Sequence, residues 1–190
     1  EAMYRGADGG YLLTDRAFAG ADTLATSYAL STAIKHVAPD VDLIIGGCQA
    51  IDGDTAQVGP QVAEKLGLNQ ITYTEEILSC KDGRITVKRH IDGGVETVES
   101  ALPLVLTVNG SAATCRPRNA KLVMKVKRAL APMELEKDTT YADLPYADQY
   151  EKKPYLKIGQ LSCADVKADL SQCGLAGSPT KVKNVENIVF

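Results

Sequence analysis

The sequence predicts an α/β fold whose central sheet is parallel. Residues 41–45 form an apolar, β-branched run that stops at two glycines, which is typical of a strand buried on both faces of a parallel sheet. A glycine-rich loop follows, and then a helical pattern that begins at Pro60. A second strand and helix precede this unit, between residues 11 and 37. Since consecutive strand, helix and strand normally form a right-handed crossover, we expect residues 11–45 to be one βαβ unit.

The first long helix is expected at residues 23–37. Asp22 suits its N-cap, because a carboxylate there accepts hydrogen bonds from free amides of the first turn, and Pro39 ends it. The residues expected to face the core are Leu24, Tyr28, Ala29, Ala33, Ile34 and Val37. If the flanking strands are parallel neighbours, the loops 15–23 and 46–58 emerge at one edge of the sheet and face the same ligand.

The loop at residues 46–59 is the strongest candidate for a ligand site. It joins the carboxyl end of a predicted strand to the start of a helix, where backbone amides and the helix dipole favour an anion such as a nucleotide phosphate. Gly53 and Gly59 are expected to leave room for a ligand to approach the backbone. The spacing matches neither the Walker pattern nor GxGxxG, so the pattern alone is a weak signal.

Two acidic residues in this loop restrict how it could bind a phosphate group. Asp52 and Asp54 would repel phosphate, so their better uses are capping amides or binding ribose hydroxyls. Phosphate is then left to the amides of residues 55–58 and to neutral donors such as Thr55 and Gln57. A capped surface loop without a ligand is the alternative interpretation.

Residues 71–110 have a strand-like period instead. The Asp-Gly pair at 82–83 lies between alternating runs and predicts a β-hairpin, and the Asp-Gly-Gly run at 92–94 predicts a second turn. Residues 104–108 are expected to be another buried strand. His90 lies among charged neighbours in the first hairpin, so we interpret it as an exposed strand residue and not as a catalytic base.

Charge is distributed unevenly in the rest of the chain. Residues 115–132 carry basic residues and no acidic one, with apolar residues at helical spacing, which predicts a basic amphipathic helix. Residues 133–151 are mainly acidic and, with nearby prolines, show no clear period. We therefore expect a nucleotide-binding α/β domain with β-hairpin additions at residues 1–131 and an extended C-terminal arm at 132–190. Such an arm becomes ordered only by lying on another surface. Residues 177–180 are expected to form a turn.

Composition argues against several classes of protein. The formal net charge is -3 and the basic helix has no aromatic residue to stack a base, so nucleic-acid binding is not favoured. No apolar run is long enough to span a membrane. The five cysteines show no metal-binding spacing, and reduced thiols in the cytoplasm are expected. No nucleophile stands beside a base, so we expect no self-sufficient enzyme, no catalytic residue and no metal site.

The run GCQAIDGDTAQVGPQ at residues 47–61 resembles the adenine-nucleotide loop of the electron-transfer flavoprotein beta subunit. The resemblance extends to LLTDRAFAGADTLATSYAL at 12–30 and GLAGSPTKV at 174–182. The stretch DRAFAGADT at 15–23 resembles the electron-bifurcating branch of this family, whose beta subunit holds a second FAD where the ordinary branch holds AMP. Against the family, the chain is expected to begin within the domain and to lack both the opening strand and the final segment.

This resemblance implies a Rossmann-like fold and an electron carrier. The beta subunit would bind FAD and, with an alpha subunit, transfer electrons from NADH to an acyl-CoA-type or other flavin dehydrogenase by bifurcation. It would take part in NADH oxidation only within that flavoprotein complex. The residues expected to bind the cofactor are Arg16, Phe18, Asp22, Thr23, Gly47, Cys48, Gln49, Ala50, Ile51, Asp52, Gly53, Asp54, Thr55, Ala56, Gln57 and Val58.

Three of these expectations concern single residues. Arg16 would lie near the flavin pyrimidine ring and raise the flavin potential by stabilising the reduced, anionic form, although an exposed cation is the structural alternative. Phe18 would cover a ring, although a lone phenylalanine is more often part of a core. Leu122 is the nearest match to the leucine that the family presents to its dehydrogenase.

Three other functions stay open at this point. A conventional electron-transfer flavoprotein would hold AMP in the same loop in a structural role, and would need neither Arg16 nor space for a flavin ring. A stand-alone module resembling universal stress proteins would bind ATP without a partner and would not need the acidic arm. A structural subunit would leave the loop empty.

Overall fold

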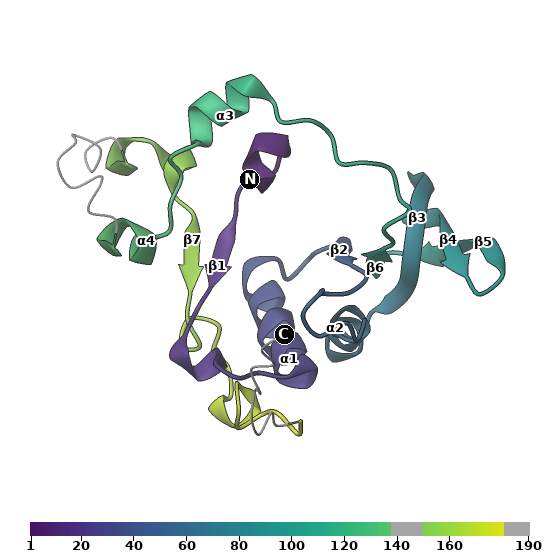
Figure 1. Ribbon diagram of the computed structural model, residues 1–190, viewed down its shortest axis with the longest axis horizontal. Coiled ribbons are helices and arrows are strands. Elements are labelled where there is room, and N and C mark those ends of the chain that lie inside the picture. The colour runs from purple at the N-terminus through teal and green to yellow at the C-terminus, as the bar shows by residue number, and fades with distance from the viewer. Residues whose placement is uncertain (138–149, 181–190) are drawn as a thin grey trace, which may run out of the picture. The chain divides into compact units, whose positions relative to one another are not determined.

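The structure, a computed structural model, describes residues 1–137 and 150–180 (Figure 1). The chain divides into two compact units, each built from two separate stretches. The first unit combines residues 1–14 with 114–162, and the second combines 15–113 with the residues from 163 onward. The predicted boundary between residues 131 and 132 stays a prediction, and most of the acidic part of the predicted arm lies outside the described residues.

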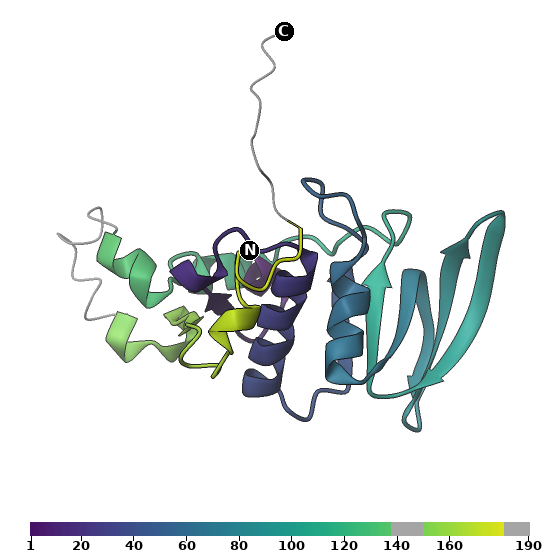
Figure 2. The same ribbon diagram turned by 90° about the horizontal axis from the view of Figure 1, so that it is seen from below.

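The second unit is a mixed sheet with two helices. Its strands lie in the order β2 (Leu43–Gly47), β6 (Leu104–Val108), β3 (Asn69–Lys81), β4 (Arg84–Ile91) and β5 (Gly94–Ala101). The ladders β2–β6 and β6–β3 are parallel, whereas β3–β4 and β4–β5 are antiparallel. The helices α1 (Thr23–Val37) and α2 (Val58–Leu66) stand side by side (Figure 2). The predicted α/β fold class with parallel strands is confirmed.

The first unit is smaller. Its strands β1 (Tyr11–Leu13) and β7 (Gly159–Leu161) form a parallel pair. Its helices and 3-10 turns are η1 (Ala2–Arg5), α3 (Ala120–Val126), α4 (Pro132–Lys137) and η4 (Pro154–Leu156). Tyr150 and Leu156 form a small apolar core there, against which Leu135 packs. None of the helices in the described parts of either unit is long and apolar enough to cross a bilayer.

The pairing of β1 overturns the predicted βαβ unit at residues 11–45. β1 pairs with β7, and no ladder joins it to β2 within the described residues. β2 lies two residues later than predicted and is an edge strand of the described sheet. Its residues are half-buried or exposed, so its predicted burial on both faces is also wrong. Ile45 accordingly leaves 56% of its surface exposed. An apolar run predicts a strand, but which strands pair with it depends on residues far away in the sequence.

The β-hairpins agree with the sequence. Asp82 and Gly83 have φ angles of 53° and 70°, the left-handed pair that a two-residue hairpin turn requires. Ile85 and Val87 on β4 are fully buried, as are Leu104 and Leu106 on β6, and together they form the core of the second unit. The predicted buried strand at 104–108 is therefore confirmed.

The predicted inner face of α1 is confirmed at Ala29 and Ala33, whereas the larger residues predicted there are half-buried or exposed. The residues that it buries are small: Ala25, Ser27, Ala29, Ser31 and Ala33. The hydroxyls of Ser27 and Ser31 are satisfied by the carbonyls of Leu24 and Tyr28, at 2.8 and 2.9 Å. Leu24, which was predicted to face the core, is 39% exposed. Small side chains let α1 approach its neighbours closely, so their size outweighed the hydrophobicity that guided the prediction.

Helix α3 is shorter than the basic helix predicted across residues 115–132. It begins after Asn119, whose side-chain oxygen accepts a hydrogen bond from the amide of Leu122 at 3.1 Å, and it ends at Val126. Val126 is its one buried residue, and Leu122 is half-buried.

Candidate functional site

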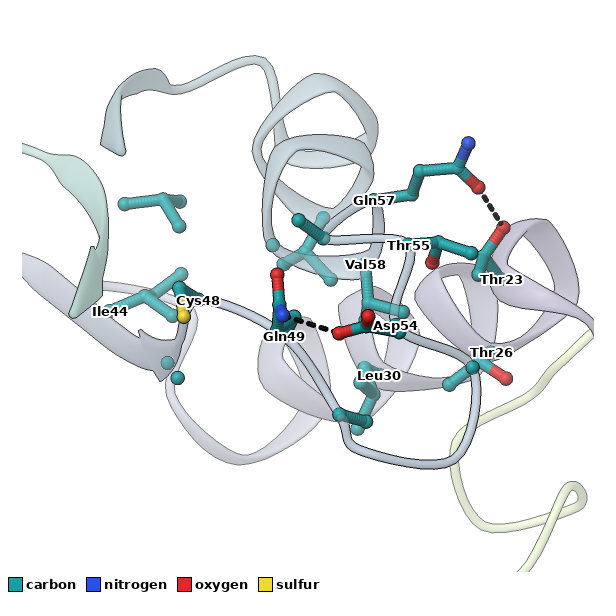
Figure 3. Close-up of a pocket in the computed structure, with 18 of the residues that line it drawn as sticks. Thr23, Thr26, Leu30, Ile44, Cys48, Gln49, Asp54, Thr55, Gln57 and Val58 are labelled. Carbon is teal, nitrogen blue, oxygen red and sulfur yellow. Dashed lines mark hydrogen bonds between the residues drawn. The ribbon is translucent and has the colours of Figure 1, made fainter. Parts of the chain in front are cut away.

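A cavity of about 620 Å³ in the second unit lies where both helices begin and where β2 ends (Figure 3). Its polar lining comes from the start of α1 and from the loop that joins β2 to α2. Its apolar lining comes mainly from α1, β2, α2 and β6, and includes Leu30, Ile34, Ile44, Ile45, Val58, Val62, Val105 and Leu106. An apolar cavity with polar groups gathered at one end is the usual form of a small-molecule site.

Most of the residues predicted to bind a cofactor line this cavity. These are Asp22, Thr23, Gly47, Cys48, Gln49, Ala50, Asp52, Gly53, Asp54, Thr55, Ala56, Gln57 and Val58. Arg16, Phe18 and Ile51 are not part of the lining. Arg16 is exposed and Phe18 half-buried on η2 (Arg16–Phe18), and Ile51 is fully exposed at the loop tip.

The apolar lining of the cavity was not predicted from the sequence. Ile34 was predicted only as a core residue of α1, and Val105 and Leu106 only as part of a buried strand. Thr26 and Leu30 carried no signal, because a helix pattern does not show which of its half-exposed positions border a cavity. They join the site because the start of α1 lies against the start of α2.

A hydrogen bond between the two helix starts brings the predicted loops together. The Thr23 hydroxyl donates to Oε1 of Gln57 at 2.9 Å, as the dashed line in Figure 3 shows. Nε2 of Gln61 lies 3.5 Å from the Thr23 hydroxyl, within hydrogen-bond reach. The loops therefore meet through α1 and α2, and not through a shared sheet edge as the sequence suggested.

The amides at the start of α2 are free to bind an anion. Within the described residues, no acceptor is found for the amides of residues 55–59. Gln57, at the N-cap, makes no side-chain cap. Ala56 has a φ of 53° and Gln57 has φ and ψ of -90° and -30°, an alternation of left- and right-handed backbone that turns successive N–H groups toward one point. With the helix dipole, these groups favour a phosphate oxygen.

The start of α1 differs because a carboxylate already occupies it. Oδ1 of Asp22 accepts hydrogen bonds from the amides of Leu24 and Ala25, each at 3.0 Å, and Oδ2 accepts one from Thr180 at 3.0 Å. Burial alone would raise the pKa of Asp22, but these hydrogen bonds lower it overall. Asp22 therefore lines the cavity while its oxygens cap backbone amides, so the start of α1 has fewer amides left for an anion than the start of α2.

The loop at residues 15–22 is fastened by a segment from far along the chain. Asp15 accepts hydrogen bonds from the amides of Ala17 at 3.0 Å and Cys163 at 3.1 Å. The hydroxyl of Ser178 accepts one from the amide of Asp22 at 2.8 Å. The predicted turn at 177–180 thus supports the loop beside the cavity.

The two glycines expected to leave room for a ligand have different roles. A Cβ on Gly53 would meet no atom within 4 Å, so this position is open. A Cβ on Gly59 would lie 2.4 Å from Cγ2 of Thr107, so this glycine is needed for α2 to pack on β6. The side chain of Asp54 is hydrogen-bonded to Gln49 within the loop.

The described residues contain no cluster of three or more histidine, cysteine or acidic side chains that could hold a metal ion. The polar groups of the cavity are backbone amides, hydroxyls and side-chain amides, with the carboxylates of Asp22, Asp52 and Asp54. This set of donors suits a phosphate and hydroxyl-bearing ligand such as a nucleotide.

Comparison with known proteins connects this geometry to a family. Residues 1–132 match the sequence model of the electron transfer flavoprotein domain. The chain is 38% identical to the electron transfer flavoprotein subunit beta of Megasphaera elsdenii over 97% of its length, which spans 60% of that relative. It is 38% identical to Protein FixA of Bradyrhizobium diazoefficiens over 97% of its length, which spans 57% of that protein. The chain thus covers less than two thirds of the length of these relatives. The loop that lines the cavity lies within the matched residues 1–132. On this match and these identities, the chain belongs to the electron transfer flavoprotein family.

Proposed function

We propose that the cavity binds an adenine nucleotide whose phosphate lies on the amides of residues 55–59. The observation that carries this proposal is the set of amides without acceptors, among the described residues, at the polar end of an otherwise apolar cavity. The side-chain NH2 group of Gln57 is a neutral donor beside them, while the Thr23 hydroxyl donates to Oε1 of the same side chain. The apolar lining suits the adenine ring, since its faces are apolar.

We further propose that the chain is an electron-transfer flavoprotein beta subunit that works with an alpha subunit in the cytoplasm. Its relatives of the same domain include proteins named electron transfer flavoprotein subunit beta. The nucleotide would be FAD, held by the loop at residues 47–58. Bound FAD would supply hydride acceptance from NADH and one-electron transfer, which is the chemistry that bifurcation needs. The protein groups hold the nucleotide and exclude water from its apolar side.

A conventional subunit with structural AMP is the second candidate. Arg16 and Phe18, the residues expected to contact a flavin ring, do not line the cavity, whereas the residues expected to hold the nucleotide do. AMP needs only the latter set. The role of Arg16 beside a flavin stays a prediction.

The test is the nucleotide content of the full-length protein purified with its alpha subunit. After denaturation, released nucleotides are separated by chromatography and counted per heterodimer. Two FAD support the bifurcating subunit, and one FAD with one AMP supports the conventional one. A heterodimer without any nucleotide beyond the flavin of the alpha subunit would refute a nucleotide site in this cavity.

Docking to a dehydrogenase through α3 is also a proposal. Leu122 is half-buried, whereas Met124 is 69% exposed and is the more accessible apolar side chain of this helix. Replacing each by alanine in the heterodimer and measuring electron transfer to the dehydrogenase distinguishes them. A larger rise in KM for Leu122→Ala supports the residue suggested by the resemblance, and a larger rise for Met124→Ala supports the exposed one.

A further inference from the structure

Two cysteines of the second unit are buried in contact with each other. The Sγ atoms of Cys163 and Cys173 lie 3.9 Å apart, and both residues carry free thiols. Cys163 is 4% exposed and Cys173 is 2% exposed. The other cysteines differ, since Cys80 and Cys115 are exposed and Cys48 lines the nucleotide cavity.

The backbone around this thiol pair is held on both sides. The amide of Cys163 donates to Asp15, and the Cys173 thiol donates to the carbonyl of Asp169 at 3.3 Å. At Gly174, which has a φ of 50°, an added Cβ would lie 2.3 Å from the carbonyl oxygen of Ala17. The pair therefore lies where residues 163–180 are fastened to the loop at residues 15–22. These contacts keep the two sulfur atoms together, so forming a bond between them needs only a small local movement.

We propose that Cys163 and Cys173 form a reversible disulfide when the protein meets a peroxide. Hydrogen peroxide oxidises one thiol to a sulfenic acid and releases a water molecule, and the second thiol then attacks that sulfur and releases another. Overall, two thiols lose two electrons and two protons, the O–O bond breaks, and two waters and one S–S bond form. To form the bond, the sulfur atoms must approach from 3.9 Å to about 2.05 Å.

The burial of the two thiols determines which oxidant can reach them and how fast they are oxidised. Burial, followed by the neighbouring Cys173 thiol, raises the pKa of Cys163 to about 11, so little thiolate is present at neutral pH. Oxidation is therefore slow at pH 7 and accelerates as the pH rises. A small neutral oxidant such as hydrogen peroxide enters a buried site, whereas a bulky aromatic disulfide reagent is excluded and reacts first with Cys80 and Cys115.

The disulfide would close the loop from residue 163 to residue 173 and so strengthen the fastening of residues 15–22. A crosslink of this kind removes conformations from the unfolded chain. We expect the melting temperature of the oxidised protein to exceed that of the reduced protein by roughly 5 °C. Reduction should reverse the shift.

The experiment treats the full chain, in complex with its alpha subunit, with hydrogen peroxide and then blocks remaining thiols with an alkylating reagent. Peptide mass spectrometry should find one crosslink, between Cys163 and Cys173, with a loss of two hydrogen masses that dithiothreitol restores. Cys80→Ser is the matched control and should keep the crosslink, whereas Cys173→Ser should lose it.

Two results would overturn the proposal. One is the recovery of Cys163 and Cys173 as reduced thiols after Cys80 and Cys115 have been fully oxidised. The other is a crosslink that forms only in denaturant, because it would show that the folded protein keeps the two thiols from reacting. Both are read from the wild-type chain, so neither depends on whether Cys173→Ser folds.

Discussion

A substitution at a single residue beside the cavity can test nucleotide binding separately from protein stability. Gly53 faces open space, so Gly53→Val should leave the melting temperature of the nucleotide-free protein unchanged. If the phosphate lies beside this backbone, the β-branched side chain should weaken nucleotide binding by about tenfold or more. Nucleotide content after purification and a titration of the stripped protein measure this effect. Unchanged affinity would place the ligand away from Gly53.

Gly59→Val is the counterpart of that change. Its Cβ would collide with Thr107, so α2 must shift away from β6. Overpacking of this kind costs about 1–3 kcal/mol of unfolding free energy. Chemical denaturation of the two variants compares them directly, and equal stabilities would contradict the packing role assigned to Gly59.

The buried thiol of Cys163 predicts an alkaline limit to stability. Its folded pKa of about 11 lies above its usual value of 9.0, so the folded protein holds this proton more tightly than the unfolded chain does. Its stabilising contribution is complete below pH 9 and is lost as the pH rises toward 11. Denaturation of the reduced protein between pH 8 and 11 tests this, with Cys163→Ala as the variant whose stability should depend less on pH. An unchanged pH dependence in that variant would assign the loss to other groups.

At the scale of elements, the close packing of α1 is the feature most open to test. Ala29 is buried on its small-residue face, whereas Leu24 on the same helix is 39% exposed. Ala29→Leu should destabilise the protein by about 1–3 kcal/mol because the helix cannot approach its neighbours, and Leu24→Ser should change stability by about 0.5 kcal/mol or less. Urea denaturation of both variants gives the comparison. A larger cost for Leu24→Ser would show that Leu24 is buried, as the sequence predicted.

Local elements were predictable where their cause is local. The N-cap at Asp22, the helix that follows it and the turn at Asp82 and Gly83 appear in the structure as the sequence indicated. Each depends on side chains and backbone angles within a few residues. The position of β2 was less accurate because the glycines that were expected to end the strand pair with β6 instead.

At the scale of the whole molecule, nucleotide binding should stabilise the second unit. A ligand that binds only the folded state at a hundred times its dissociation constant adds about 2.7 kcal/mol to the unfolding free energy. Adding AMP or FAD to the stripped, full-length heterodimer should therefore raise its melting temperature by several degrees. Gly53→Val should respond less, and equal responses in both proteins would place the binding elsewhere.

The sequence by itself determined the fold class, the hairpins, the N-cap of α1 and the loop at residues 47–58, most of which lines the cavity. These features follow from short-range patterns of glycine, acidic and apolar residues, and from the family resemblance that the comparisons confirmed.

Only the tertiary structure decided how those parts are used. It pairs β1 with β7, places Thr180 on the carboxylate of Asp22, and sets Thr107 against Gly59. Each of these contacts joins residues that are distant in the sequence, and its energy depends on burial and close approach that no local pattern encodes. For the same reason, the apolar lining of the cavity and the contact between Cys163 and Cys173 could be identified only from the structure.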